Sequence, residues 1–72
     1  MKYICKSDFE INGVLVGKEN DILEITDAVP NHNETLEDVL GYCDIKNLTT
    51  DNTYNATWID VEENENAINL EQ

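Results

Sequence analysis

The sequence YCDIKNLTTDNTYNATWIDV, residues 42–61, contains the longest β-hairpin pattern of the chain. Two runs rich in β-forming residues, 42–48 and 53–61, flank the polar tetrapeptide 49–52. Alternation of apolar and polar residues is typical of half-buried strands, and a short polar loop between two strands indicates a hairpin. The side chains expected on one face are Cys43 and Ile45 from the first strand, and Tyr54, Ala56 and Trp58 from the second. We expect Trp58 in the core or at its edge because it is the largest apolar side chain.

The segment 2–27 predicts further strands. Residues 2–6 form the first strand, with Tyr3 and Cys5 on one side. Asn12-Gly13 lies between two apolar runs, 9–11 and 14–16, and this dipeptide strongly favours a tight hairpin. A turn over 17–20 and a β-rich segment over 21–27 follow, with Ile22, Leu23 and Ile25 as the apolar positions of that segment.

Two segments are less clear. Residues 30–33 are predicted to form a loop. Thr35-x-x-Asp38 then resembles a weak capping box before a short apolar stripe. For residues 34–41 both helix and strand remain possible. We favour one or two helical turns, which Gly41 would end. Residues 62–72 are acidic and rich in Asn, and they form either a loose acidic tail or a last short element closing on the sheet through Ala67, Ile68 and Leu70.

The expected fold is mainly β with a short helix, arranged as a small antiparallel barrel or sheet. A length of 72 residues allows a single domain, residues 1–72, with a small core.

Charge is the strongest functional signal. Sixteen acids face four lysines, and the net charge is −12. Lysines and acids cancel within residues 1–20, so the whole excess lies after residue 20. A surface of this sign repels phosphate backbones and anionic membranes and attracts basic proteins. We therefore expect no direct binding to nucleic acid or membrane.

The N-terminal residues lack a long apolar segment, which argues against a signal peptide and for a cytoplasmic protein. Cys5 and Cys43 are then expected to be reduced and buried. Ser7 and His32 are the only serine and histidine, and no nucleophile–base pair or metal set is visible. We predict that the protein is not an enzyme and needs no metal or cofactor.

Carboxylates spread over a small surface can imitate the phosphates of a nucleic acid, and aromatic side chains often anchor interfaces. Tyr42 and Tyr54 are the aromatic residues expected to reach the surface. The candidate partner-binding residues are Asp21, Glu24, Asp27, Glu34, Glu37, Asp38, Asp44, Asp51, Asp60, Glu62, Glu63, Glu65, Tyr42 and Tyr54.

The chain resembles short phage and prophage proteins in its opening strand KYICKSDF, its glycine turn and hairpin NGVLVGKENDILEITD, and its later hairpin IKNLTTDNTYNATW. Such proteins are similar to SH3-like small β-barrels. The resemblance implies a mobile-element origin and a binding or assembly role. We predict an acidic module that inhibits or modulates a basic host protein, such as a nucleic-acid enzyme. The alternative is a small structural or assembly protein that associates with itself.

Overall fold

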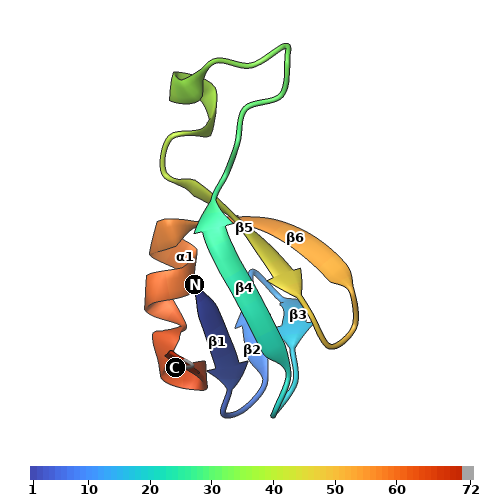
Figure 1. Cartoon of the computed structure of the whole chain (residues 1–72). Helices are drawn as coiled ribbons and strands as arrows, with labels where there is room; N and C mark the ends of the chain where they lie inside the picture. The colour runs from blue at the N-terminus through green and yellow to red at the C-terminus, as the bar shows by residue number, and fades with distance from the viewer. Residues whose placement is uncertain (71–72) are drawn as a thin grey trace.

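A computed structural model describes residues 1–70. Five antiparallel strands form one sheet in the order β6-β5-β4-β1-β7, and a separate β2-β3 hairpin lies against it (Figure 1). The strands are β1 (Lys2–Cys5), β2 (Phe9–Ile11), β3 (Val14–Gly17), β4 (Ile22–Asp27), β5 (Tyr42–Asn47), β6 (Asn52–Thr57) and β7 (Ile68–Leu70). Within this part of the chain β6 and β7 do not pair with each other. The fold is thus mainly β, as expected, and it is an open sheet.

The β2-β3 hairpin forms where Asn12-Gly13 predicts it. Both residues have positive φ angles, 52° and 81°. Two consecutive positive φ angles match the right-handed twist of the flanking strands, and Asn and Gly tolerate them best. This local preference explains why the sequence alone located the turn.

The β5-β6 hairpin is shorter than expected. Its second strand ends at Thr57, and Trp58–Glu63 form a helix, α1, so the prediction of a strand up to Val61 is wrong. The Thr57 hydroxyl accepts a hydrogen bond from the Asp60 N–H at 3.1 Å, and the Asp60 carboxylate accepts one from the Thr57 N–H at 3.4 Å. This capping box starts a helix at a point where the β-pattern continues.

Residues 62–70 form the last short element that the sequence left open beside a loose tail. The end of α1 and a 3-10 turn, η2 (Glu65–Ala67), lead to β7, which pairs with β1. The chain thereby crosses from one edge of the sheet to the other. Ile68 is buried at the new edge, and residues 71–72 lie outside the described part.

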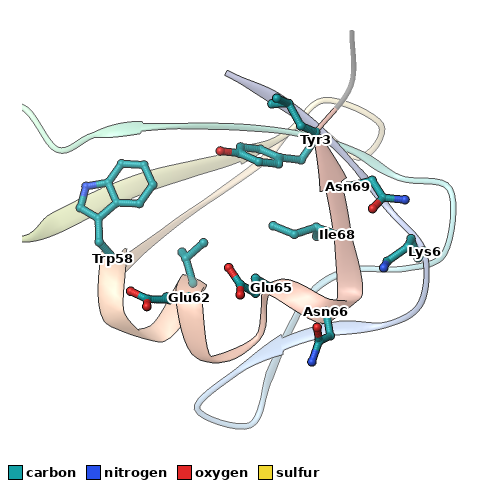
Figure 2. Close-up of a pocket in the computed structure, with 10 residues that line it drawn as sticks. Tyr3, Lys6, Trp58, Glu62, Glu65, Asn66, Ile68 and Asn69 are labelled. Atoms are coloured by element: carbon teal, nitrogen blue, oxygen red, sulfur yellow. The ribbon is translucent and has the colours of Figure 1, made fainter.

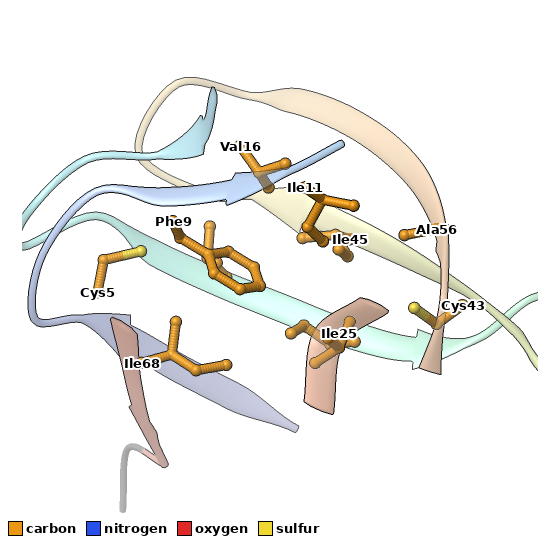
Figure 3. Packing of buried hydrophobic residues seen from close by; sticks show 11 residues of the cluster. Cys5, Phe9, Ile11, Val16, Ile25, Cys43, Ile45, Ala56 and Ile68 are labelled. Carbon is orange, nitrogen blue, oxygen red and sulfur yellow. The ribbon is translucent and has the colours of Figure 1, made fainter. Parts of the chain in front are cut away.

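The core lies between the inner face of the sheet and its cover (Figure 3). The sheet contributes Cys5, Leu23, Ile25, Cys43, Ile45, Ala56 and Ile68, and the cover contributes Phe9, Ile11 and Val16 of the hairpin and Val61 of α1. Alternate residues along each strand point to this face, as the predicted pattern requires. Tyr3, Tyr54 and Trp58 pack on the core while partly exposed, which confirms the expected place of Trp58.

Asn47 is the one buried polar residue of the described core, at 1% exposure. Its amide nitrogen donates to the Val16 carbonyl and the Asp21 carboxylate, at 3.0 and 2.9 Å. Its amide oxygen accepts from the N–H groups of Thr49 and Thr50. One side chain therefore joins the hairpin, the start of β4 and the β5-β6 turn.

Residues 28–41 leave the body of the domain as a long loop (Figure 1). A single 3-10 turn, η1 (Leu36–Val39), forms within it, and the Asp38 carboxylate accepts a hydrogen bond from the Thr35 N–H at 2.8 Å. Gly41 follows with a φ of 84°. The helical interpretation of this segment is confirmed at the length of one turn. None of the η1 residues is buried.

Candidate functional site

The acids and lysines separate along the molecule. We define the acidic end as the protruding loop 28–41, the adjoining ends of β4 and β5, and α1. It carries eight acids and no lysine: Asp27, Glu34, Glu37, Asp38, Asp44, Asp60, Glu62 and Glu63. Lys6 and Lys18 lie in turns at the opposite end of the sheet, and Lys2 and Lys46 flank Glu24 on the strands either side of it. The folded chain thus concentrates negative charge where no lysine offsets it.

Two contacts hold the parts of the acidic end together. The Trp58 N–H donates to the Gly41 carbonyl at 2.9 Å, which ties the start of α1 to the end of the loop. The indole nitrogen of Trp58 donates to the Asp27 carboxylate at 2.8 Å. The base of the loop, the end of β4 and α1 are therefore one connected surface.

The predicted acids fall into two groups. Seven of the twelve are held by internal contacts within residues 1–70: Asp21, Asp27, Glu34, Asp38, Asp44, Asp51 and Asp60. The carboxylates of the other five accept no hydrogen bond and form no ion pair there: Glu24, Glu37, Glu62, Glu63 and Glu65. Short Asp side chains readily bond to nearby backbone groups, whereas Glu extends further into solvent. Among the twelve predicted acids, the carboxylates without such a contact in residues 1–70 all belong to glutamates.

Asp21 illustrates the structural role of the first group. Its carboxylate accepts from the Lys18 N–H at 2.9 Å and from the Asn47 amide. The Lys18 hydrogen bond, the Asn47 hydrogen bond and the Lys18 charge together hold its pKa below the usual 3.8. Asp51 is similarly occupied by Lys46, at 3.4 Å. Both residues lie outside the acidic end, and the fold does not gather them with the other predicted acids.

Large apolar side chains are exposed beside these acids. Val29, Leu36 and Leu40 on the loop are 79%, 69% and 75% exposed, and Ile59 on α1 is 67% exposed. Tyr42 lies at the base of the loop, where a hollow of about 270 Å³ is lined by Leu36, Val39 and Leu40 among others. Loops of this kind commonly carry binding residues, and clustered exposed apolar groups mark interaction surfaces.

The sequence interpretation missed these apolar residues as part of the site. Leu36, Val39 and Leu40 are the short apolar stripe that follows Thr35, and in the structure none of them is buried and only Val39 is half-buried. Of the two predicted tyrosines, Tyr42 is exposed at the acidic end. Tyr54 is half-buried on β6, next to the β2-β3 hairpin.

Neither cysteine is placed for nucleophilic chemistry. Cys5 and Cys43 are free thiols buried in the core, as expected. Burial raises the pKa of the Cys43 thiol to about 11, and the charges of Asp44, Asp60 and Asp27 add to the increase. Burial likewise raises the pKa of Cys5 to about 11, with contributions from Asp21 and Asp8. Both thiols are therefore protonated at neutral pH and unreactive as nucleophiles.

Within residues 1–70 no group of three His, Cys, Asp or Glu side chains is arranged to hold a metal ion. The same part of the chain contains no helix that is long and apolar enough to cross a membrane. No protein-family model, curated protein or solved structure matches the chain. Its function is therefore inferred from the geometry of the acidic end.

Proposed function

We propose that this protein is a non-enzymatic binding module whose acidic end occupies a basic surface of a partner protein. One observation carries the proposal: eight acids and no lysine lie on the protruding loop, the adjoining ends of β4 and β5, and α1, and the loop exposes Leu36 and Leu40. Charge alone would keep the protein soluble, but charge with unpacked leucines on the same loop is typical of a docking surface.

The two features have separate physical roles. The negative field attracts a basic partner over several ångströms and raises the association rate, an effect that salt weakens. The apolar side chains leave water only on contact, so they slow dissociation. Glutamates such as Glu37 and Glu63 can follow the positions of basic groups on the partner, because no contact within residues 1–70 holds their carboxylates.

The partner in this proposal is a basic host protein, with a nucleic-acid enzyme as the most specific case. Carboxylates at the acidic end would take the places of phosphates in its binding channel. The same proposal includes three expectations from the sequence: a phage or prophage origin, an SH3-like architecture and a cytoplasmic location.

The test is affinity capture from a bacterial host lysate with tagged protein, washed in parallel at low and high salt. We expect one dominant basic protein, lost at high salt and displaced by added DNA. Leu36→Ser/Leu40→Ser and Glu34→Gln/Glu37→Gln should each reduce its recovery. The control Glu10→Gln/Glu19→Gln makes the same charge change on the β2-β3 side and should leave recovery close to that of the unaltered protein. The proposal would be contradicted if recovery of the captured protein were the same at low and high salt and were reduced by neither the leucine variant nor the Glu34/Glu37 variant.

A second function is favoured by the open edges of the sheet. β6 and β7 each have one unpaired side within residues 1–70, and unpaired strand edges can associate with another copy. A structural or assembly role would follow from such pairing. Sizing with light scattering decides between the two: a defined oligomer supports assembly, and a monomer at high protein concentration supports the docking module.

A further inference from the structure

A second surface feature lies on the flank of α1, apart from the protruding loop. It is a groove of about 520 Å³ between the α1-η2 segment and the edge formed by β1 and β7 (Figure 2). Its lining residues are Tyr3, Lys6, Trp58, Val61, Glu62, Glu65, Asn66, Ile68, Asn69 and Leu70.

Two aromatic rings border the groove. Tyr3 and Trp58 are both half-buried and pack on the core, so part of each ring faces the open space. The bond from the indole nitrogen to Asp27, at 2.8 Å, fixes the Trp58 ring in place. The buried side chains of Val61 and Ile68 lie beneath. Rings held in this way can stack on a ligand without losing much side-chain freedom.

Two carboxylates accompany the rings. Glu62 and Glu65 lie one turn apart near Trp58 and Tyr3, and neither bonds to another described residue (Figure 2). Lys6 lines the same groove, but it lies toward Asn66 and Asn69 at the end away from Trp58. It forms no ion pair with a carboxylate, since Lys46–Asp51 is the only pair found across residues 1–70. The negative charge beside the rings is therefore not neutralised within the described structure.

Aromatic faces attract cations, and free carboxylates attract them further. An anion would be repelled here, and an apolar ligand would remove water from Glu62 and Glu65 without replacing its hydrogen bonds. A guanidinium group suits the combination best, because it is planar, stacks on rings and donates two parallel hydrogen bonds to a carboxylate. An ammonium group is compact and more strongly hydrated, so it gains less from stacking.

We propose that this groove binds an arginine side chain of a basic polypeptide, stacked on Trp58 and Tyr3 and hydrogen-bonded to Glu62 and Glu65. The inference deepens the proposed function by naming a side chain that the basic partner would insert. It rests on that function only for the identity of the protein that supplies the arginine, because the groove can be tested with a peptide.

The experiment titrates the purified full chain with hexa-arginine and follows the emission of Trp58. Trp58 is the only tryptophan, so the indole emission comes from a ring that borders this groove, and the variants below separate binding in the groove from binding elsewhere on the acidic surface. We expect a saturable change in emission with hexa-arginine and none with the uncharged analogue hexa-citrulline. Hexa-lysine should bind more weakly, by roughly threefold or more, because it stacks less well. Equal affinity and equal emission change for the two cationic peptides would overturn the assignment to arginine.

Two sets of variants localise the binding. Glu62→Gln/Glu65→Gln should weaken hexa-arginine about fivefold, while the control Glu10→Gln/Glu19→Gln, with the same net charge, should weaken it by less than about twofold. Tyr3→Leu should weaken it about threefold without any change of charge. Equal weakening by the two glutamate pairs, or unaltered binding by Tyr3→Leu, would show general attraction to the acidic surface and overturn the proposal. If the peptide binds as expected but lysate capture fails, the arginine site in the groove is supported and the proposed function is contradicted. If lysate capture succeeds but the peptide does not bind as expected, the proposed function is supported and the arginine site is contradicted.

Discussion

The two ends of this molecule use the same kinds of residue in opposite ways. Around the β2-β3 hairpin and the β5-β6 turn, Phe9, Ile11 and Val16 are buried, and Asp21 and Asp51 are held by Asn47 and Lys46. At the acidic end, Leu36 and Leu40 are exposed, and the carboxylates of Glu37 and Glu63 have no contact within residues 1–70. Internal contacts hold the named side chains of the first end, whereas those of the second end face water.

The comparison also separates Asp from Glu. The Asp residues of the acidic end mostly build the scaffold: Asp27 orients Trp58, and Asp38 and Asp60 each bond the N–H at the start of a helical turn. Since these carboxylates already accept hydrogen bonds, an acid count overstates the number of carboxylates that can reorient freely. The glutamates are the groups to alter in a binding experiment.

The largest difference between the ends should appear in stability. Phe9, on the β2-β3 hairpin, is completely buried. Phe9→Ala should lower the free energy of unfolding by roughly 3–5 kcal/mol, enough to unfold much of a domain this small. Leu36→Ala at the acidic end should change it by less than about 0.5 kcal/mol. Urea denaturation followed by Trp58 fluorescence measures both, and comparable losses would contradict the division into a packed end and a docking end.

Substitution of Asn47 should cause the second-largest loss of stability. Asn47→Ala removes the bonds to Val16 and Asp21 and leaves the turn N–H groups without an acceptor, at a cost of about 2–3 kcal/mol in unfolding free energy. Asn55 is the matched control, because its exposed amide also donates twice, to the Cys43 carbonyl and the Asp44 carboxylate. Asn55→Ala should cost roughly 0.5 kcal/mol in the same urea assay. Similar losses of unfolding free energy in the two variants would mean that burial does not strengthen the contribution of Asn47 to stability.

Alkaline pH should weaken the packed core. The folded pKa of each thiol is raised to about 11 from an ordinary 9.0, so the unfolded chain loses these protons first. The stabilisation is complete below pH 9 and is lost as the pH rises from 9 to 11. The unfolding free energy should therefore fall less steeply over this interval in Cys43→Ala than in the unaltered protein. Parallel pH profiles would contradict the raised thiol pKa.

Acidic pH should have the smallest effect on the unfolding free energy among these four predictions. The pKa of Asp21 is lowered from 3.8 in the folded state, so its stabilisation is present above pH 3.8 and is lost as the pH falls through the folded pKa. Asp21→Asn should make the unfolding free energy less dependent on pH below 4. Glu63→Gln serves as the control, since that carboxylate makes no internal contact among the described residues. An equal effect of the two substitutions would show that only overall charge matters.

Sequence patterns located most of the strands because strand alternation and the Asn12-Gly13 turn are local signals. They failed at Trp58, where the β-pattern of Tyr54 and Ala56 runs on into a capping box formed by Thr57 and Asp60. The same Thr-x-x-Asp spacing was recognised at Thr35, so the signal was present in the sequence. It was outweighed by the alternation that precedes it, since both patterns are short.

The candidate site was predicted only in outline. The excess of acids after residue 20 is a property of composition, and it led to candidate residues spread over 21–65. Which acids are free depends on hydrogen bonds between distant segments, such as Asp27 with Trp58 and Asp21 with Asn47. The unpacked leucines were hidden for the same reason, because a helical stripe looks identical whether or not a partner covers it.

By itself, the sequence determined the β class, the hairpin turns and the strong negative charge, since these depend on backbone preference, side-chain alternation and the count of ionised groups. Only the tertiary structure decided that the charge gathers at one end, that the chain crosses through α1 to pair β7 with β1, and that Tyr3 and Trp58 border one groove with Glu62 and Glu65. These arrangements join residues far apart in the chain, and long-range packing, which no local pattern encodes, brings them together.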